Sequence, residues 1–361
     1  MDKASLWLFT MLYRLLRAFI LIAILIALIG GNRMVNRNDS QDIALRPLPL
    51  DANNRQRRDV GALTFLRAWE LRSSNSDFGG ISALVALPDG RFMGLSDAGI
   101  LIGFGLTRDD AADRPFIAAL PGAVGPNISY EDRDSEGIAF DRETGRFWVS
   151  YEGKHMIRRF TPSFARINGK AVPQEMKNWG ANSGGEAFVR LDDGRFILFS
   201  EGMDLPGRGY QALLFSGDPV EQGTSHFSFA YRPPKGYKPT DATLLPDGRI
   251  LLLNRRISFP DGFTAKLILL DSATIQKNEV VTGEVIASLA PPLLVDNMEG
   301  LTVTQENGRI IVWMVSDNNF NAWQRTILMK FALNFTDAKE PKSGAATKKP
   351  EAEIAPGFQS L

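Results

Sequence analysis

A short turn motif recurs five times in the middle of the chain and limits what it can fold into. In each copy a polar residue precedes a glycine, an arginine follows it, and apolar segments lie on both sides. The turn glycines are Gly90, Gly145, Gly194, Gly248 and Gly308. Asp-Gly and Asn-Gly between apolar segments favour tight β-hairpins, because such turns need a positive φ that glycine adopts without steric cost. The sequence therefore predicts five antiparallel hairpins.

The spacing of the turns favours a β-propeller. Successive turn glycines lie 55, 49, 54 and 60 residues apart, which is too far for heptads or short solenoid repeats and close to the length of a propeller blade. The segments between them, such as 211–215 and 265–270, are short and apolar rather than long amphipathic helices. A β-sandwich would explain the hairpins but not this period.

The number of blades is less constrained than the architecture. The region from 60 to 335 would make five blades of about 55 residues or six of about 46, and blades commonly take about 40 to 50. We therefore expect an all-β, six-bladed propeller, with five blades as the alternative. The sixth blade would combine 61–71 with 326–335 and close the ring, or it would lie within 98–134.

A hydrophobic segment precedes the repeat. Residues 18–29 are wholly apolar, and Leu6–Tyr13 adds a milder apolar stretch. Together, 6–29 has the length of a membrane span, whereas the continuous run alone has that of a signal peptide. Leu28 and Ile29 fit poorly with a small-residue cleavage site. We expect an uncleaved signal anchor in the inner membrane, with the rest of the chain on the periplasmic side; secretion after cleavage is the alternative.

These observations divide the chain into four segments. They are an anchor at 1–31, a polar linker at 32–59, a propeller at 60–335 and a tail at 336–361. The tail is rich in charge and proline and poor in bulky apolar residues, a composition typical of disorder.

Composition excludes several kinds of chemistry. The chain has no cysteine and only two histidines, His155 and His226, so disulfides, thiolate zinc sites, cysteine nucleophiles and multi-histidine metal sites are excluded. Its 41 Lys and Arg balance 41 Asp and Glu, which argues against nucleic acid as a partner. It has no G-x-S-x-G nucleophile motif and no P-loop or dinucleotide fingerprint, so we expect no nucleotide. Because it has no cysteine and only two histidines, we also expect no haem and no zinc. Any metal must bind through oxygen.

Acidic residues flank the predicted turns at nearly constant distances. A polar residue lies seven to nine positions before each turn glycine, and another lies seven to nine positions after it. In an antiparallel hairpin these positions come together at the end away from the turn. A ring of hairpins would gather them at one face, around the central opening. The carboxylates in question are Asp97, Glu136, Glu152, Glu186, Glu201, Asp241, Glu299 and Asp317.

Converging carboxylates need protons or a cation, since they repel one another when ionised. Ca²⁺ suits an irregular set of carboxylates, because it accepts about six to eight oxygens with loose geometry. The predicted Ca²⁺ ligands are Glu136, Glu152, Glu186, Glu201, Asp241, Glu299 and Asp317. Glu136, Glu186 and Glu299 are the strongest candidates, because each adjoins a glycine that permits close approach of the backbone.

Basic residues accompany this set. Arg255 takes the position that an acid holds in the other four hairpins, and Lys154, Arg208 and Arg325 lie in loops just after second strands. A guanidinium beside a bound cation would suit a phosphate or carboxylate ester. The predicted catalytic residues are Glu136, Glu186, Glu299, Arg255 and Arg325.

The order of these motifs is similar to that of a known family. The relevant segments are Asp134–Ala139, Tyr151–Gly153, Gly184–Ala187, Ser200–Gly202, Pro239–Ala242, Asn254–Arg255, Asn297–Leu301 and Ser316–Phe320. In this order they resemble the family described as esterase-like activity of phytase, or phytase-like domains, which are propeller proteins common among exported bacterial products. The resemblance spans residues 60–335. It implies hydrolysis of an ester or phosphate ester, with Ca²⁺, and carries over no catalytic residue.

Three functions are consistent with these observations. We expect a metal-assisted hydrolase of a small-molecule ester or phosphate ester. In it the ion polarises the carbonyl or phosphoryl oxygen, a Glu or Asp takes a proton from water, and Arg255 or Arg325 stabilises negative charge. A calcium lactonase of the same fold is one alternative. A tethered propeller that binds a partner at the cell envelope without catalysis is the other.

Overall fold

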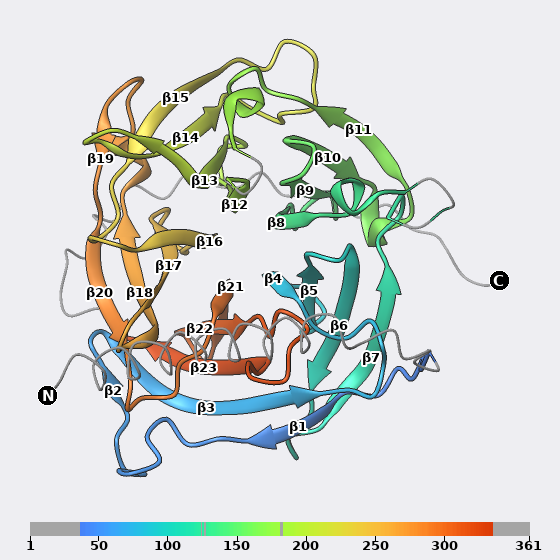
Figure 1. Ribbon diagram of the computed structural model, residues 1–361, viewed down its shortest axis with the longest axis vertical. Helices are drawn as coiled ribbons and strands as arrows, with labels where there is room; N and C mark the ends of the chain where they lie inside the picture. The colour runs from blue at the N-terminus through green and yellow to red at the C-terminus, as the bar shows by residue number, and fades with distance from the viewer. Residues whose placement is uncertain (1–36, 124, 126–127, 181–182, 335–361) are drawn as a thin grey trace, which may run out of the picture.

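The computed structural model describes residues 37–334, except 124, 126, 127, 181 and 182 (Figure 1). The predicted anchor and the predicted C-terminal tail lie outside these residues. Within them, no helix is long and apolar enough to cross a bilayer. They form β-strands and four short 3-10 helices, η1 (Tyr130–Asp132), η2 (Pro162–Phe164), η3 (Glu175–Asn178) and η4 (Ser272–Thr274).

Five sheets stand around a central opening as the blades of a propeller (Figure 1). Blade 1 contains β4 (Ile81–Ala86), β5 (Phe92–Ser96), β6 (Ile100–Leu106) and β7 (Ala112–Ala119). Blade 2 contains β8 (Ser135–Phe140), β9 (Phe147–Tyr151), β10 (Met156–Phe160) and β11 (Ile167–Ala171). Blade 3 contains β12 (Gly185–Arg190), β13 (Phe196–Leu205), β14 (Gly209–Phe215), β15 (His226–Tyr231) and the short β19 (Val280–Val281).

The other two blades complete the ring. Blade 4 contains β16 (Lys238–Leu244), β17 (Ile250–Ser258), β18 (Gly262–Leu270) and β20 (Glu284–Leu289). Blade 5 contains β21 (Met298–Glu306), β22 (Arg309–Ser316), β23 (Ile327–Leu333) and β3 (Leu63–Arg72), with β1 (Ala44–Pro47) and β2 (Asp59–Val60) paired to β3. The innermost strand of each blade, which is β4, β8, β12, β16 or β21, contacts the innermost strands of its two neighbours.

The ring closes through a strand from the start of the fold. β3 pairs with β23, so it completes the sheet formed by the last three strands. The expected closure of the ring by 61–71 and 326–335 is confirmed, but these segments complete the fifth blade instead of forming a sixth. Region 98–134 supplies β6 and β7 of blade 1 and a long connection. The propeller expectation is therefore confirmed in its five-bladed form, and the preferred count of six is not met.

The chain packs on the propeller before residue 60. β1 pairs with the outer edge of β3, Leu50 is buried, and Asp51 forms a β-bridge with Leu293. The described part of the predicted linker, 37–59, therefore packs on blade 5, and the side chain of Gln41 also accepts the backbone N–H of Ile117 in blade 1 at 2.6 Å.

The five predicted hairpins are present in the structure. All five turn glycines have positive φ, for example +83° at Gly90 and +86° at Gly194. The arginine that follows is part of the turn chemistry. The side chain of Arg91 donates to Asp89 at 2.7 Å, and that of Arg195 donates to its own turn aspartate at the same distance. The repeated Asp-Gly-Arg therefore stabilises turns and needs no role in function.

The core lies between neighbouring blades. Between blades 5 and 1, Trp69 stacks on Trp313 with ring centroids 6.4 Å apart, and Phe92 lies 4.7 Å from Trp313. Burial of a large apolar side chain contributes about 1.5–3 kcal/mol. Packing between the sheets therefore stabilises the ring as a whole.

A buried carboxylate joins the inner strands at the axis. Asp241 of β16 is 1% exposed. Its Oδ2 accepts the backbone N–H of Leu301 in β21 at 2.7 Å and of Leu84 in β4 at 3.4 Å, and its Oδ1 accepts that of Ala242 at 2.8 Å. Burial raises the pKa of Asp241 well above its usual value, and these three N–H groups oppose the shift. One side chain thus satisfies backbone donors from three blades.

We expect Asp241→Ala to lower the free energy of unfolding by about 3 kcal/mol or more, because each buried donor left without an acceptor costs about 1–3 kcal/mol. Urea unfolding followed by circular dichroism measures the change. The matched control is Asp247→Ala in the turn of the same hairpin, where the aspartate side chain is 41% exposed; it should cost less than about 1 kcal/mol. Equal losses in the two variants would contradict the axial role of Asp241.

Candidate active site

Each inner strand has a β-bulge close to its start. There its pairing with the second strand of the blade shifts by one residue. A bulge bends a strand and re-aims a side chain. The residues within these bulges are Ser82, Glu136, Glu186, Thr240 and Glu299, and all five are buried. Burial raises the pKa of Glu136 and of Glu186 well above the usual value, and nearby acids, Glu299 among them, raise both further.

Glycine beside the bulge lets neighbouring inner strands approach each other. A Cβ atom on Gly137 would lie 2.3 Å from the carbonyl oxygen of Glu186, and one on Gly300 would lie 2.9 Å from Cβ of Leu84. Both contacts cross from one blade to the next. The close backbone approach predicted from the Glu-Gly pairs is confirmed at these two positions.

The end of each second strand lies beside the start of the inner strand. The backbone N–H groups of Asp97, Glu152, Glu201 and Asp317 donate to carbonyls of Gly80, Asp134, Gly184 and Asn297 at distances of 2.9, 2.9, 3.1 and 2.8 Å. In blade 4 the corresponding pair is Lys238 and Arg255. Three positions per blade therefore gather at one end of the propeller, which we call the acidic face. The opposite end, with the turn glycines, is the turn face.

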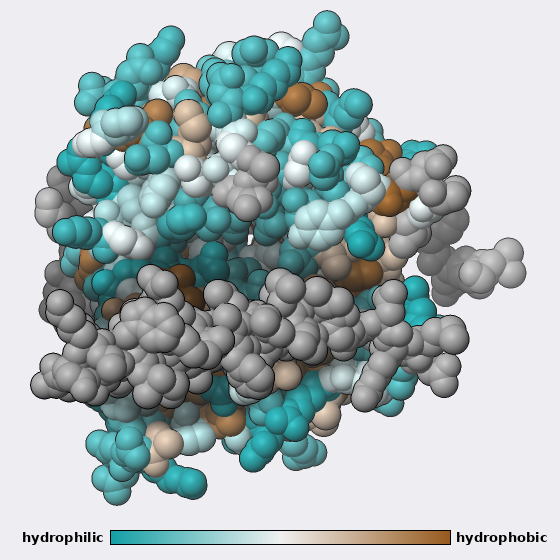
Figure 2. Space-filling model, in the orientation of Figure 1, coloured by the Kyte–Doolittle hydropathy of each residue, from teal (hydrophilic) through white to brown (hydrophobic). Residues whose placement is uncertain are grey.

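The three positions differ in charge from blade to blade. They are Gly80, Ser82 and Asp97 in blade 1; Asp134, Glu136 and Glu152 in blade 2; Gly184, Glu186 and Glu201 in blade 3; Lys238, Thr240 and Arg255 in blade 4; and Asn297, Glu299 and Asp317 in blade 5. Blade 2 has three acids and no cation, whereas blade 4 has two cations and no acid. Hydrophilic residues border the central opening on the face shown in Figure 2.

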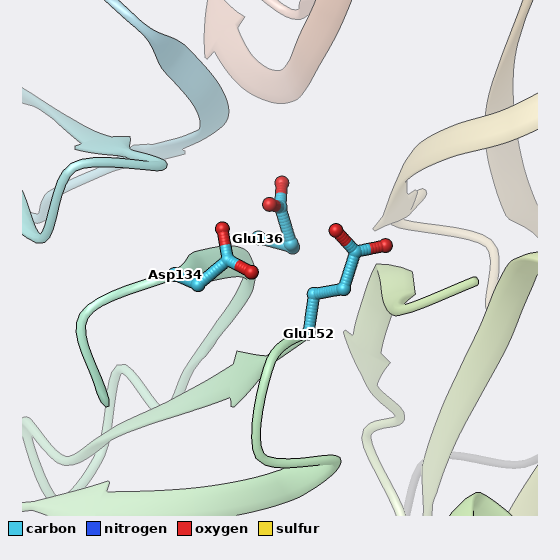
Figure 3. Close-up of side chains that lie close together, drawn as sticks. All are labelled: Asp134, Glu136 and Glu152. Atoms are coloured by element: carbon cyan, nitrogen blue, oxygen red, sulfur yellow. The ribbon is translucent and has the colours of Figure 1, made fainter. Parts of the chain in front are cut away.

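Blade 2 gathers three carboxylates, of which Glu152 accepts the backbone N–H of Gly184 at 2.8 Å and has its pKa lowered in part by Lys238. One oxygen from each of Asp134, Glu136 and Glu152 lies within 4.8 Å of the others, and the side chains point into a shared space (Figure 3). None of the three forms an ion pair within the described part of the chain. Glu136 is 8% exposed, and among the described residues no donor reaches its carboxylate. One Ca²⁺ could bridge the three oxygens, because its bonds to oxygen are about 2.3–2.6 Å long.

Burial and repulsion disfavour ionisation of this cluster. Burial raises the pKa of Glu136 well above its usual value, and the nearby Glu299, Glu152 and Asp134 raise it further. Burial also raises the pKa of Glu152 to about 7 and increases that of Asp134. A divalent cation would offset this cost by favouring the ionised carboxylates. At neutral pH the cluster should therefore hold either protons or a cation.

Arg255 neutralises acids on the other side of the opening. Its guanidinium pairs with Glu201 at 3.3 Å and with Glu299 at 3.0 Å, and it donates to the side-chain oxygen of Asn297. Burial lowers the pKa of Arg255, but Glu299, Glu201 and other acids outweigh burial and raise it overall. Lys238 adds a second cation 3.4 Å from Glu201. This half of the acidic face therefore has its own positive charge.

Glu299 and Asp317 have raised pKa values despite these contacts. Burial raises the pKa of Glu299 to about 8; Arg255 lowers it in part and Asp317 raises it. Burial raises the pKa of Asp317 to about 7, although it accepts the backbone N–H of Asn319 at 2.7 Å. The side-chain amide of Asn297 donates to both carboxylates, at 2.7 and 3.3 Å. A carboxylate with a pKa near neutral can take a proton from water under working conditions.

Asp241 does not share the position of the other predicted ligands. In blade 4 the bulge contains Thr240, and Asp241 follows it and points its oxygens at backbone N–H groups on the axis. Distance from the turn misplaced this residue because each bulge residue lies eight or nine positions before its turn glycine, whereas Asp241 lies seven positions before Gly248. The geometry does not support a metal-binding role for Asp241.

The remaining predicted cations lie away from the clustered carboxylates. Arg325 lies at the edge of the acidic face, where its Nε is 3.9 Å from Asp296. Lys154 pairs with Glu131 at 3.2 Å. Arg208 donates to the backbone carbonyl of Asn278. Of the predicted basic residues, Arg255 alone forms ion pairs with the predicted carboxylates.

Asp134 and Lys238 are site residues that the sequence analysis did not select. Each lies two residues before the bulge residue of its blade, the position that Asn297 occupies in blade 5. Because side chains alternate along a strand, residues two apart share a face. From this period, Asp134 could have been predicted to lie on the same face as Glu136.

A cavity of about 740 Å³ lies on the axis, toward the turn face, and the inner strands of all five blades line it. Inner-strand residues beyond the bulges, such as Leu84–Pro88, Ile138–Glu143 and Ala242–Pro246, line it. None of the carboxylates of the acidic face does so. The chemistry of the side chains, not the size of the cavity, therefore locates the candidate site.

These features define a five-bladed propeller with clustered carboxylates and a paired guanidinium at one face. The chain belongs to the family described as esterase-like activity of phytase, whose match covers residues 76–320, more than half of the chain. The resemblance predicted from the ordered motifs is confirmed. No curated protein matches the chain.

Several solved structures are similar to the chain at low identity. Glutaminyl cyclase of Myxococcus xanthus is 13% identical with a TM-score of 0.46, over 76% of this chain and 97% of that one. An exo-1,5-α-L-arabinanase from a bovine ruminal metagenomic library is 15% identical with a TM-score of 0.44, over 73% and 97%. The gluconolactonase XC5397 of Xanthomonas campestris is 10% identical with a TM-score of 0.38, over 80% and 98%. At these values they bear on neither the activity nor the ligand of the chain.

In the presence of chelator, we expect stability to fall as the pH rises from about 5 to about 8. The raised pKa values, about 7 for Glu152 and Asp317 and about 8 for Glu299, keep these carboxyls protonated in the folded protein. The unfolded chain has already lost those protons, so the folded state binds more of them and rising pH favours unfolding. Melting temperatures across this range measure the effect, and a flat or rising profile would contradict it. Added Ca²⁺ should flatten the fall.

Proposed function

We propose that the chain is an exported, membrane-tethered hydrolase that cleaves an ester or phosphate ester at its acidic face with bound Ca²⁺. The observation that carries the proposal is the unequal distribution of charge between blades 2 and 4. Blade 2 offers Asp134, Glu136 and Glu152 without a cation, and blade 4 offers Lys238 and Arg255 without an acid. A polar or anionic ester group could contact both halves.

The carboxylates of blade 2 are the part of the site that would hold the ion. Their oxygens lie within 4.8 Å of one another, and the buried Glu136 has no donor among the described residues. A buried carboxylate without a partner is costly, which favours a bound cation there. When bound, Ca²⁺ would polarise the carbonyl or phosphoryl oxygen of the substrate.

Glu299 is the general base in this proposal. Asn297 donates to its carboxylate at 2.7 Å and Arg255 lies 3.0 Å from it, so two groups hold it in place. It takes one proton from the attacking water while the water oxygen bonds to the ester carbon or phosphorus, and the leaving-group oxygen departs with the bonding electrons. Arg255 positions Glu299 and supplies positive charge where negative charge develops.

We expect Glu136→Gln to weaken Ca²⁺ binding by about 10- to 100-fold, because it removes a charge from the centre of the ligand set without changing its shape. Isothermal calorimetry with Ca²⁺ measures the affinity. The matched control is Glu143→Gln in the same blade, since Glu143 is an exposed acid in the turn. Unchanged affinity in Glu136→Gln would contradict the proposed ion site.

Hydrolysis is tested on a chromogenic acetate ester, a lactone and a phosphate monoester, each with Ca²⁺ or with chelator. Chelator and Glu136→Gln should both abolish turnover of the same substrate. Turnover of the lactone alone would favour the calcium lactonase alternative. If Ca²⁺ binds but no substrate is cleaved, the non-catalytic binding propeller is the better description.

We expect Arg255→Gln to lower kcat by about 100-fold or more, because it removes positive charge that the transition state needs. Since Arg255 lowers the pKa of Glu299, the acid limb of the pH–rate profile should also move to higher pH in this variant. A pH–rate profile of wild type and variant measures both effects. A variant with lower kcat and an unmoved acid limb would contradict the assignment of Glu299 as the base.

A further inference from the structure

The described chain begins at the acidic face. Arg37 pairs with Asp77 at 2.6 Å, and Asn38 and Ser76 exchange two hydrogen bonds of 2.9 Å. Residues 73–80 connect β3 to the start of inner strand β4, which lies at the acidic face. Gly80 in this connection accepts the backbone N–H of Asp97. The predicted membrane segment is therefore joined to the propeller at the end that carries the candidate site.

The connection to the predicted membrane segment is short. Seven residues, 30–36, separate the apolar run 18–29 from Arg37, so they reach at most about 30 Å when fully extended. A tether of this length keeps the face at which Arg37 pairs with Asp77 close to the predicted membrane segment.

Large apolar side chains are exposed preferentially at the same face. Within the described residues there are nine such side chains. Seven lie in or beside loops of the acidic face, and the other two lie on outer strands; the seven are Ile128, Tyr130, Val172, Ile257, Phe259, Phe320 and Trp323. Phe259, at the tip between β17 and β18, is fully exposed, and Trp323, between β22 and β23, is 94% exposed. Among the described residues, the loops of the turn face have none, although Ile167 and Val285 lie at the ends of β11 and β20 that follow turn-face loops.

Exposed cations lie among these side chains. Arg232 and Lys235 are exposed in the connection from β15 to β16, and Arg325 follows Trp323 by two residues. Aromatic side chains favour the interface between lipid headgroups and acyl chains, and Lys and Arg favour anionic headgroups. The combination suits a lipid surface better than bulk water.

We propose that the acidic face rests on the surface of the bilayer that holds the N-terminal segment, with Phe259 and Trp323 inserted among the lipid headgroups. The carboxylates and Arg255 then open toward the membrane, so their ligand reaches them from the lipid surface. An ester or phosphate ester of a lipid headgroup is the substrate class that this placement adds to the proposed function. The placement itself does not depend on hydrolysis.

Lipid quenching of tryptophan fluorescence tests this placement in the full-length protein. The protein is reconstituted into vesicles of phosphatidylethanolamine and phosphatidylglycerol whose acyl chains carry bromine close to the headgroup. Trp7→Phe removes the tryptophan of the N-terminal segment, and the four tryptophans other than Trp323 that remain are buried in the propeller. We expect brominated lipid to quench this protein, and the further change Trp323→Phe to remove most of the quenching.

A matched variant reports on the opposite face. Gln222 is exposed between β14 and β15 at the turn face, so Gln222→Trp in the Trp7→Phe, Trp323→Phe background should not be quenched. Three results would each overturn the proposal. They are quenching that Trp323→Phe leaves unchanged, equal quenching at Gln222→Trp, and no quenching at any position. Because no substrate is involved, failure of the proposed hydrolase would leave this result unaffected.

Discussion

The β-bulge at the start of each inner strand is the constraint on which the site depends. In a regular strand, side chains alternate between the two neighbouring blades; the extra residue of the bulge breaks that alternation. Glu136, Glu186 and Glu299 each lie in such a bulge and are buried at the acidic face. Glycine beside the bulge allows the inner strands to approach, and Asp241 binds backbone N–H groups from three of them. The backbone geometry of the inner strands therefore determines where the carboxylates lie, and the side chain of Asp241 in turn stabilises that geometry.

Gathering buried carboxylates is costly, and the structure offsets the cost unevenly. On one side, Arg255 and Lys238 pair with Glu201 and Glu299. On the other, the acids of blade 2 have no cation among the described residues. The first set has cations of its own, although burial still raises the pKa of Glu299, whereas the second needs protons or an ion. We infer that this uneven distribution of cations connects stability with function. The carboxylates of blade 2, which form no ion pair among the described residues, are the ones able to bind an ion.

Much of the architecture could be predicted because it depends on local chemistry. The turn glycines need positive φ, so they recur and give the blade period; ring closure by 61–71 followed from the same count. The number of blades could not be predicted from the spacing of the turns, because long connections such as 120–134 lengthen the repeating unit. Within the site, Glu136 and Arg255 were found by distance from the turn, whereas Asp241 was misassigned by one position and Asp134 was missed. A bulge shifts register without a signal in spacing, and only the pairing of strands reveals it.

A crystal structure of the protein grown with Ca²⁺, with anomalous scattering recorded, tests the central claim most directly. The account predicts one strong anomalous peak among the carboxylates of Asp134, Glu136 and Glu152, and none beside Arg255. A peak beside Glu201 or Asp317 with the blade 2 cluster empty, or no peak on the acidic face at saturating Ca²⁺, would contradict it.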